Sequence, residues 1–274
     1  MKASKTVKSS SPIGIFDSGI GGLTVADAIH KLLPAETLIY FGDTAHLPYG
    51  DKAPESIRAY SVRIADFLLE HGCKMIVIAC NTASSIAYEA VKEHVGARAT
   101  VIDVINPVVA EVSSMKKITH VGVIGTRATI RSNAYATRIV RQNENLKVSS
   151  LATPLLAPMI EEGFFNNKIS RTVINSYLSR PKIKKIDALI LACTHYPLIK
   201  AEITEYYKGN ITIVDSAAIV ARFVKQSLAA SKLLHTGKAG KHRFYISDFT
   251  KSFEQSTKIF FKDKLKLEHK NLWQ

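Results

Sequence analysis

The sequence predicts an α/β protein built as two pseudo-symmetric lobes, each a mainly parallel sheet flanked by helices. Short apolar, β-branched runs alternate with stretches whose apolar residues recur at helical spacing. The second half of the chain also repeats the order of segments of the first half. Because ligands bind beyond the carboxyl ends of parallel strands, we expect the active site in the cleft between the lobes.

The strands expected in the first half are mainly apolar runs, typical of strands covered on both faces. They span residues 13–16, 37–41, 74–79 and 100–105. Helical spacing predicts helices over 23–33, 54–70 and 84–95. Gly72 closes the second helix, and Ser84 or Thr82 is the expected N-cap of the third.

Three segments of the second half parallel three of the first. "HVGVIGTRAT" (120–129) parallels "PIGIFDSGIG" (12–21), and "ALILACTHYP" (188–197) parallels "MIVIACNTAS" (75–84). Between them, "SSLATPLLAPMIEEG" occupies the place of "YFGDTAHLPYG". "ITIVDSAAIVARFV" (211–224) predicts one more strand and helix that return to the first lobe.

These segments define the expected domain organisation. We expect a flexible N-terminal arm over residues 1–11, because this stretch is basic, Ser-rich and without a core-forming pattern. The first lobe is expected to comprise residues 12–104 plus about 214–274. Residues 105–213 are expected to form the second lobe.

Composition narrows the class of protein. Hydrophobic residues make up 46% of 274 residues, which is typical of a globular chain. Apolar runs are too short for a membrane span, and the N-terminus lacks the apolar region of a signal peptide. We therefore expect a cytoplasmic protein that does not contact a membrane. Three cysteines without a CxxC pair predict neither a disulfide framework nor a zinc site, and the histidines show no metal-ligand spacing.

The formal net charge of +14 has two interpretations: affinity for nucleic acid or attraction of an anionic substrate. Part of the excess, +6, lies in residues 229–274, and much of this tail follows an amphipathic pattern that we interpret as a solvated, charged surface. No aromatic-rich RNA-binding motif or zinc module accompanies it. Nucleic acid is therefore not an expected partner.

Cys80 and Cys193 stand at the ends of matched strands. A cysteine after an apolar run is usually buried and inert, but the repeat of the pattern in both lobes favours function. If the lobes face each other, one thiolate can remove a proton from a carbon while the other thiol delivers one to the opposite face. A thiol suits both roles, because its usual pKa of about 8.5 is near neutrality. Cys73 has no polar neighbours in sequence and is expected to be structural.

Neighbouring residues could assist these thiols. Asp17 ends the first strand and His195 lies two residues after Cys193, so each could exchange a proton with a sulfur. Small polar residues at strand ends, together with helix N-termini, could hold an anion. These residues are Ser18, Asn81, Thr82, Thr126 and Thr194.

Two other motifs bear on nucleotide binding. "GIGGLT" (19–24) departs from GxGxxG in its last place and lacks the GK[ST] of a P-loop, so we expect a tight turn with exposed N–H groups. Asp43, at the end of a strand, could mimic a ribose-binding acid.

Together, "GIFDSGIGGLTV", "YFGDTAHLPYG", "IVIACNTAS", "VGVIGTRATI", "ILACTHYPLI" and "VDSA" resemble the glutamate racemase family, within the aspartate/glutamate racemase superfamily, over roughly residues 12–225. The resemblance implies cofactor-independent interconversion of L- and D-glutamate, supplying D-glutamate for peptidoglycan. It implies that Cys80 takes the α-proton from the D-isomer and Cys193 from the L-isomer. Asp17, His195 and Glu161 then match the assisting acid–base positions. The implied substrate contacts are Asp17, Ser18, Tyr49, Gly50, Asn81, Thr82, Thr194 and His195.

The resemblance leaves some questions open. His46 stands where Arg, Lys or Asn is as frequent, and the arm before Pro12 raises the question of activation by a cell-wall precursor, which the sequence does not answer. A homodimer is expected, with an interface that cannot be identified from the sequence. Racemisation of aspartate or another amino acid is the main alternative, and a basic nucleic-acid-binding protein is a second.

Overall fold

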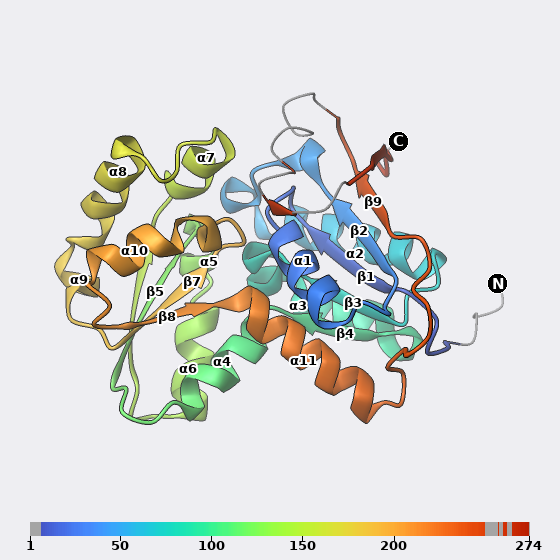
Figure 1. Ribbon diagram of the computed structural model, residues 1–274, viewed down its shortest axis with the longest axis horizontal. Helices are drawn as coiled ribbons and strands as arrows, with labels where there is room; N and C mark the ends of the chain where they lie inside the picture. The colour runs from blue at the N-terminus through green and yellow to red at the C-terminus, as the bar shows by residue number, and fades with distance from the viewer. Residues whose placement is uncertain (1–6, 250–256, 258–259, 262–264, 274) are drawn as a thin grey trace.

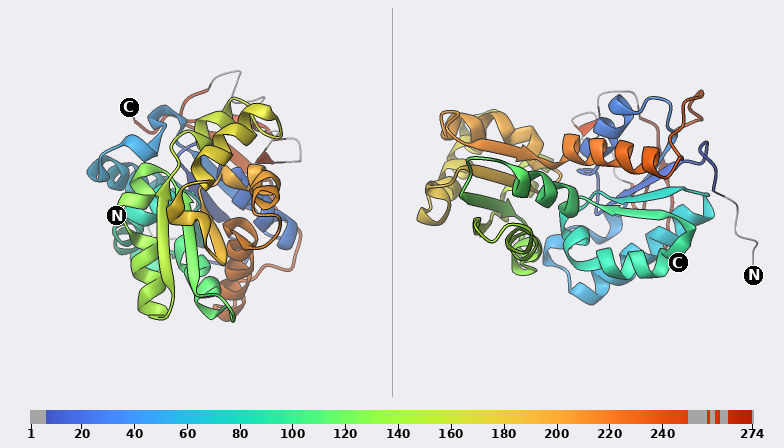
Figure 2. Two further views of the ribbon diagram at one scale, coloured as in Figure 1. Left: turned by 90° about the vertical axis from the view of Figure 1, so that its left-hand side faces the viewer. Right: turned by 90° about the horizontal axis from the view of Figure 1, so that it is seen from below.

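The computed structural model describes residues 7–249, 257, 260–261 and 265–273. The described chain forms two sheets whose strand pairs are parallel, each sheet flanked by helices (Figure 1). The right view of Figure 2 shows the sheets in separate lobes that lie side by side. The predicted α/β class with two lobes is confirmed.

The first sheet has the strand order β10-β9-β2-β1-β3-β4. Its strands are β1 (Ile13–Asp17), β2 (Leu38–Gly42), β3 (Met75–Ile78), β4 (Thr100–Asp103), β9 (Arg243–Ile246) and β10 (Leu267–His269). The helices among them are α1 (Leu23–Leu32), α2 (Pro54–Glu70) and α3 (Asn81–Val95), with short 3₁₀ turns at Thr44–His46, Tyr49–Asp51 and Gly96–Arg98. The four strands expected in the first half are all present, and α2 has the predicted bounds.

The second sheet has the order β6-β5-β7-β8. Its strands are β5 (His120–Gly125), β6 (Lys147–Ala152), β7 (Ala188–Ala192) and β8 (Thr212–Asp215). The helices from β4 onward are α4 (Ile105–Ser114), α5 (Arg127–Arg131), α6 (Ala134–Gln142), α7 (Leu156–Glu161), α8 (Lys168–Leu178), α9 (Pro181–Lys184), α10 (Lys200–Tyr206) and α11 (Ser216–Ala230), with a 3₁₀ turn at Tyr196–Ile199. In each lobe the central strand, β1 or β5, lies between two parallel neighbours.

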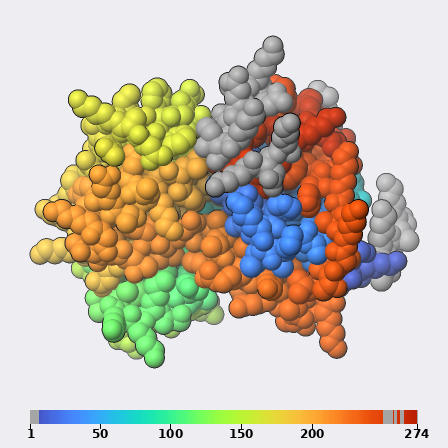
Figure 3. Space-filling view, in the orientation of Figure 1, coloured from blue at the N-terminus to red at the C-terminus, as the bar shows by residue number. Residues whose placement is uncertain are grey.

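The segment 211–224 is divided between the two lobes. Its strand, β8, pairs with β7 in the second sheet, whereas α11 packs against α1 and α4. In the space-filling view, the blue surface around α1 lies beside the orange surface of the later chain (Figure 3). The chain therefore returns to the first lobe at the junction of β8 and α11. The exact domain boundaries remain a prediction.

The C-terminal segment contributes more to the fold than its charge pattern predicts. β9 pairs with β2 and β10 pairs with β9, so residues expected to form only a solvated surface extend the first sheet. Phe260 and Phe261 are buried in the core. Residues 250–256, 258–259, 262–264 and 274 of this segment lie outside the described residues.

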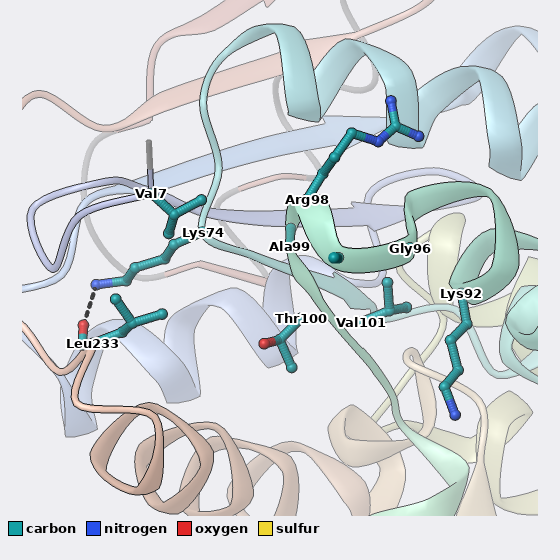
Figure 4. Close-up of a pocket in the computed structure, with 10 residues that line it drawn as sticks. Val7, Lys74, Lys92, Gly96, Arg98, Ala99, Thr100, Val101 and Leu233 are labelled. Atoms are coloured by element: carbon teal, nitrogen blue, oxygen red, sulfur yellow. Dashed lines mark hydrogen bonds between the residues drawn. The ribbon is translucent and has the colours of Figure 1, made fainter. Parts of the chain in front are cut away.

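A buried ion pair lies at the amino ends of the strands of the first sheet, just before β2 and β3. Lys74 Nζ lies 2.6 Å from Glu36 Oε2. Figure 4 shows the hydrogen bond that Lys74 Nζ also donates to Leu233 O, at 2.8 Å. Lys74 Nζ further donates to Ser9 O at 2.5 Å. Residues 8–11, part of the arm predicted to be flexible, therefore form a turn held against the sheet, while residues 1–6 lie outside the described part. Within the described chain, no helix combines the length and apolar character needed to span a membrane.

Candidate active site

One small cavity, of about 60 Å³, lies where the carboxyl ends of strands from both sheets face each other. Both lobes contribute to its walls, and both predicted catalytic thiols line it. The lining residues are Ser18, Leu47, Pro48, Tyr49, Gly50, Cys80, Asn81, Thr82, Thr126, Ala157, Pro158, Glu161, Ala192, Cys193, Thr194 and His195.

Cys80 links the end of β3 to the start of α3. Its backbone is extended and its sulfur accepts a hydrogen bond from the Ala83 N–H at 3.4 Å, so Cys80 itself is the N-cap. The prediction of Ser84 or Thr82 as the cap is wrong, because the helix begins directly after the cysteine, and the Ser84 hydroxyl donates to Ile78 O instead. The thiol of Cys80 donates to Ser18 Oγ at 3.5 Å. Burial, reinforced by the nearby negative charge of Asp17, raises the pKa of the Cys80 thiol to about 12.

Asp17 lies behind the cavity wall and does not line the cavity. Its Oδ2 accepts hydrogen bonds from the N–H groups of Gly19 at 3.1 Å and Gly22 at 2.9 Å. A Cβ at Gly22 would lie 2.5 Å from Asp17 Cβ, so only glycine fits there. The turn predicted to expose N–H groups to a ligand instead directs two of them at Asp17. Burial raises the pKa of Asp17, although His195 and these N–H groups oppose the shift.

Cys193 follows β7 and has a histidine beside it. Cys193 Sγ lies 3.5 Å from His195 Nδ1. On the other side of the ring, His195 Nε2 lies 2.8 Å from Glu161 Oε1, an ion-pair contact without the alignment of a good hydrogen bond. Burial alone lowers the pKa of His195, but Cys193 and Glu161 outweigh it and leave the pKa well above its usual range. The imidazole therefore connects a thiol to a carboxylate at the end of α7.

Threonine hydroxyls join the two lobes beside the thiols. Thr82 Oγ1 lies 2.9 Å from Thr126 Oγ1 and 3.2 Å from Thr129 Oγ1, and the latter two are 2.9 Å apart. Thr82 belongs to the first lobe, and its two partners belong to the second. Another link runs from the Thr24 hydroxyl to Thr194 O at 3.1 Å. Thr129 was missed because the pattern around it gives only an ordinary helix start.

Asp43 is buried outside the cavity wall, and its carboxylate is occupied by protein donors. It accepts from Tyr49 Oη at 2.7 Å, from the Ser247 hydroxyl at 2.7 Å and from the indole N–H of Trp273 at 3.1 Å. His46 Nδ1 lies 2.8 Å from the same group. Asp43 therefore holds the loop that places Tyr49 at the cavity and does not face a ligand.

Several cavity residues were not singled out from the sequence, although their motifs were. Leu47 and Pro48 belong to "LPYG", and Ala157 and Pro158 to "APMIEEG". Their apolar side chains carry no chemistry that the sequence could signal. In the described part of the chain, no group of three or more His, Cys, Asp or Glu side chains could hold a metal ion.

Fold and site together define a class: a two-lobed α/β protein with a cysteine of each lobe facing one buried cavity. The family model described as "Asp/Glu/Hydantoin racemase" matches residues 13–224, and the chain belongs to this family. It is 44% identical to the glutamate racemase of Geobacter metallireducens, over 88% of this chain and 89% of that protein. Identity to the glutamate racemase of Chlorobium phaeobacteroides is also 44%, over 93% of this chain and 94% of that protein.

Among solved structures, the chain is similar to glutamate racemase from Francisella tularensis in complex with D-glutamate. The TM-score is 0.91 at 41% identity, covering 97% of this chain and 99% of that one. The fold described above is therefore that of glutamate racemase structures.

Proposed function

We propose that this protein is a glutamate racemase that moves the α-proton of glutamate between Cys80 and Cys193. The observation that carries the mechanism is that the two thiols, at corresponding strand ends of two sheets, line one cavity. The identities to glutamate racemases over nearly the whole chain support glutamate as the substrate.

The reaction needs one thiolate and one thiol. The thiolate takes the α-proton, so the C–H bond breaks, an S–H bond forms and the electron pair stays on the carbon, delocalised into the α-carboxylate. The opposite thiol then gives its proton to the other face of the carbon, so its S–H bond breaks and a new C–H bond forms. The configuration inverts, and thiol and thiolate have exchanged places. Cys80 would act on the D-isomer and Cys193 on the L-isomer.

The surroundings suggest how each sulfur is made ready. Cys80 holds its proton at neutral pH, because its pKa is raised to about 12. The charge of the buried Asp17 carboxyl acts on Cys80. We therefore assign Asp17 to exchange a proton with the Cys80 thiol. His195, 3.5 Å from Cys193 Sγ and paired with Glu161, would do so on the other side.

Polar groups of the cavity wall would hold the charges of glutamate. Ser18, Asn81, Thr82, Thr126 and Thr194 offer hydroxyl or amide groups, and Tyr49 and Gly50 close the wall on the first-lobe side. By resemblance to the family, we further propose that the protein supplies D-glutamate for peptidoglycan in the cytoplasm and works as a homodimer.

The decisive experiment is incubation of the protein with L-glutamate in D₂O without added cofactor. We expect D-glutamate that carries deuterium at Cα, because the returned proton comes from a thiol equilibrated with solvent. L-Aspartate, tested in parallel, should react far more slowly. Absence of α-deuterium in glutamate, or faster turnover of aspartate, would refute the proposal.

A further inference from the structure

A buried tyrosine of the second lobe is bonded to a cavity residue of the first. Tyr135 lies on α6, is 2% exposed, and donates from Oη to Asn81 Oδ1 at 2.7 Å. Asn81 is the first residue of α3, follows Cys80 directly and lines the cavity. Tyr135 does not line the cavity, so it can influence a ligand only through Asn81.

The hydrogen bond determines which end of the Asn81 carboxamide is free. A carboxamide has an oxygen that accepts and an NH₂ group that donates. With Oδ1 engaged by Tyr135, Nδ2 is left buried, and no described residue accepts a hydrogen bond from it. A buried donor without a partner costs free energy, so the site favours a ligand that supplies an acceptor. Burial also raises the pKa of Tyr135, so its phenol keeps the proton that it donates.

The helix that carries Tyr135 is itself fixed to the first lobe. Arg138, one turn further along α6, donates from Nη1 to Asp103 Oδ2 and to Asn106 Oδ1, both at 2.9 Å. Asp103 ends β4, and Asn106 lies at the start of α4. Residues three apart on a helix share a face, so Arg138 holds Tyr135 at a constant place relative to Asn81.

We propose that Tyr135 is a positioning residue that orients the Asn81 carboxamide so that its NH₂ group meets a carboxylate of the bound amino acid. The inference rests on the proposed function for the identity of that ligand. In the opposite orientation, the amide oxygen would face the carboxylate and repel it. Because both enantiomers carry the same carboxylates, the effect falls on binding of both and not on proton transfer.

The test is Tyr135→Phe, which removes only the hydroxyl. We expect KM to rise about tenfold or more for both L- and D-glutamate, the loss typical of a weakened hydrogen bond to a charged group. kcat should stay within about threefold of wild type, since the thiols are untouched. Tyr207→Phe is the matched control, because its hydroxyl is also buried and donates to Ile183 O at 2.8 Å, but away from the cavity. It should leave KM and kcat unchanged.

A double-mutant cycle checks that Tyr135 acts through Asn81. In an Asn81→Ala background, Tyr135→Phe should change KM by less than about twofold, because the orientation no longer matters. An equally large effect in that background would overturn the inference. So would an unchanged KM in Tyr135→Phe, or a fall in kcat at constant KM.

Calorimetric binding of D-glutamate separates this inference from the proposed function. Wild type that binds D-glutamate without racemising it would refute the function, and a Kd weakened about tenfold in Tyr135→Phe would still support the role of Tyr135. An equal Kd in the two proteins would overturn that role. Wild type that does not bind D-glutamate would overturn both.

Discussion

Cys80 and Cys193 occupy corresponding places in two lobes of similar plan, yet their surroundings differ in chemistry. Cys80 contacts the Ser18 hydroxyl and the Ala83 N–H, with the buried carboxyl of Asp17 behind the wall. Cys193 instead contacts His195, whose ring lies against Glu161. The repeated backbone places two thiols at one cavity, whereas we propose that the local side chains decide how each thiol gains and loses its proton.

A third thiol, that of Cys73, shows that a raised pKa alone does not identify the thiols that we propose to react. Burial raises the pKa of Cys73 to about 12, the same value as for Cys80. Cys73, however, packs in the apolar core beside Gly14 and Leu68, without a polar partner among the described side chains. Position at a strand end and polar contacts distinguish Cys80.

The strongest test of the comparison is to remove each thiol in turn. Cys80→Ser and Cys193→Ser should each lower racemisation in both directions by about 10³-fold or more, because a hydroxyl is a far poorer acid–base group at neutral pH. Circular dichroism of L- and D-glutamate solutions measures both directions. Near wild-type turnover in either variant would exclude the two-thiol mechanism.

The unequal neighbours can be probed with Asp17→Asn and His195→Asn. Each should lower kcat by about 10²-fold, the usual contribution of an acid–base group. We expect Asp17→Asn to slow kcat more for D-glutamate, and His195→Asn more for L-glutamate. Since the equilibrium constant between enantiomers is fixed at one, kcat/KM must fall equally in the two directions. Equal losses of kcat for both substrates in both variants would show that the neighbours do not serve separate thiols.

Cys73, which we expect to be structural, should affect stability at alkaline pH. The folded protein keeps the Cys73 proton up to about pH 12, while the unfolded chain loses it near the usual thiol pKa of about 8.5. The folded state therefore binds more protons between these values, and the free energy of unfolding falls as pH rises through that window. In wild type this thiol lowers the free energy of unfolding by up to about 1.4 kcal/mol for each pH unit within that window. Cys73→Ala should abolish this contribution, which urea unfolding at a series of pH values measures.

The same Cys73→Ala variant should keep kcat/KM within about twofold of wild type at neutral pH, because Cys73 does not line the cavity. A large loss of activity with intact folding would contradict a purely structural role for Cys73. An unchanged alkaline slope would show that burial does not hold its proton.

The smallest effect concerns a contact between the C-terminal segment and the loop that carries Tyr49 in the first lobe. Trp273 donates to Asp43, which in turn accepts from Tyr49 at the cavity. Trp273→Phe keeps an aromatic ring but removes this donor, so the free energy of unfolding should fall by about 1 kcal/mol. KM should rise by a few-fold at most, and kcat should not change. Unchanged stability in thermal unfolding would show that the C-terminal segment does not anchor this loop.

Prediction from sequence succeeded where the signal is local and failed where it depends on distant partners. Three apolar runs of the first half form β1, β2 and β3, and every residue of these strands is buried. β10 was missed because it is an edge strand whose flanking residues include several lysines, and such a sequence resembles an exposed surface. Tyr135 was missed because its partner, Asn81, lies 54 residues away along the chain, and no short-range pattern marks such a contact.

By itself, the sequence determined the class of fold, the duplication of its plan and the two strand-end cysteines, since hydrophobic periodicity and motif order are properties of the chain alone. Only the tertiary structure decided that Asp17 uses the glycine N–H groups, that Cys80 caps its own helix, and that Glu161 reaches His195. These are contacts between buried polar groups. Burial makes each such group require a partner, and which partner comes within reach depends on how the two lobes pack.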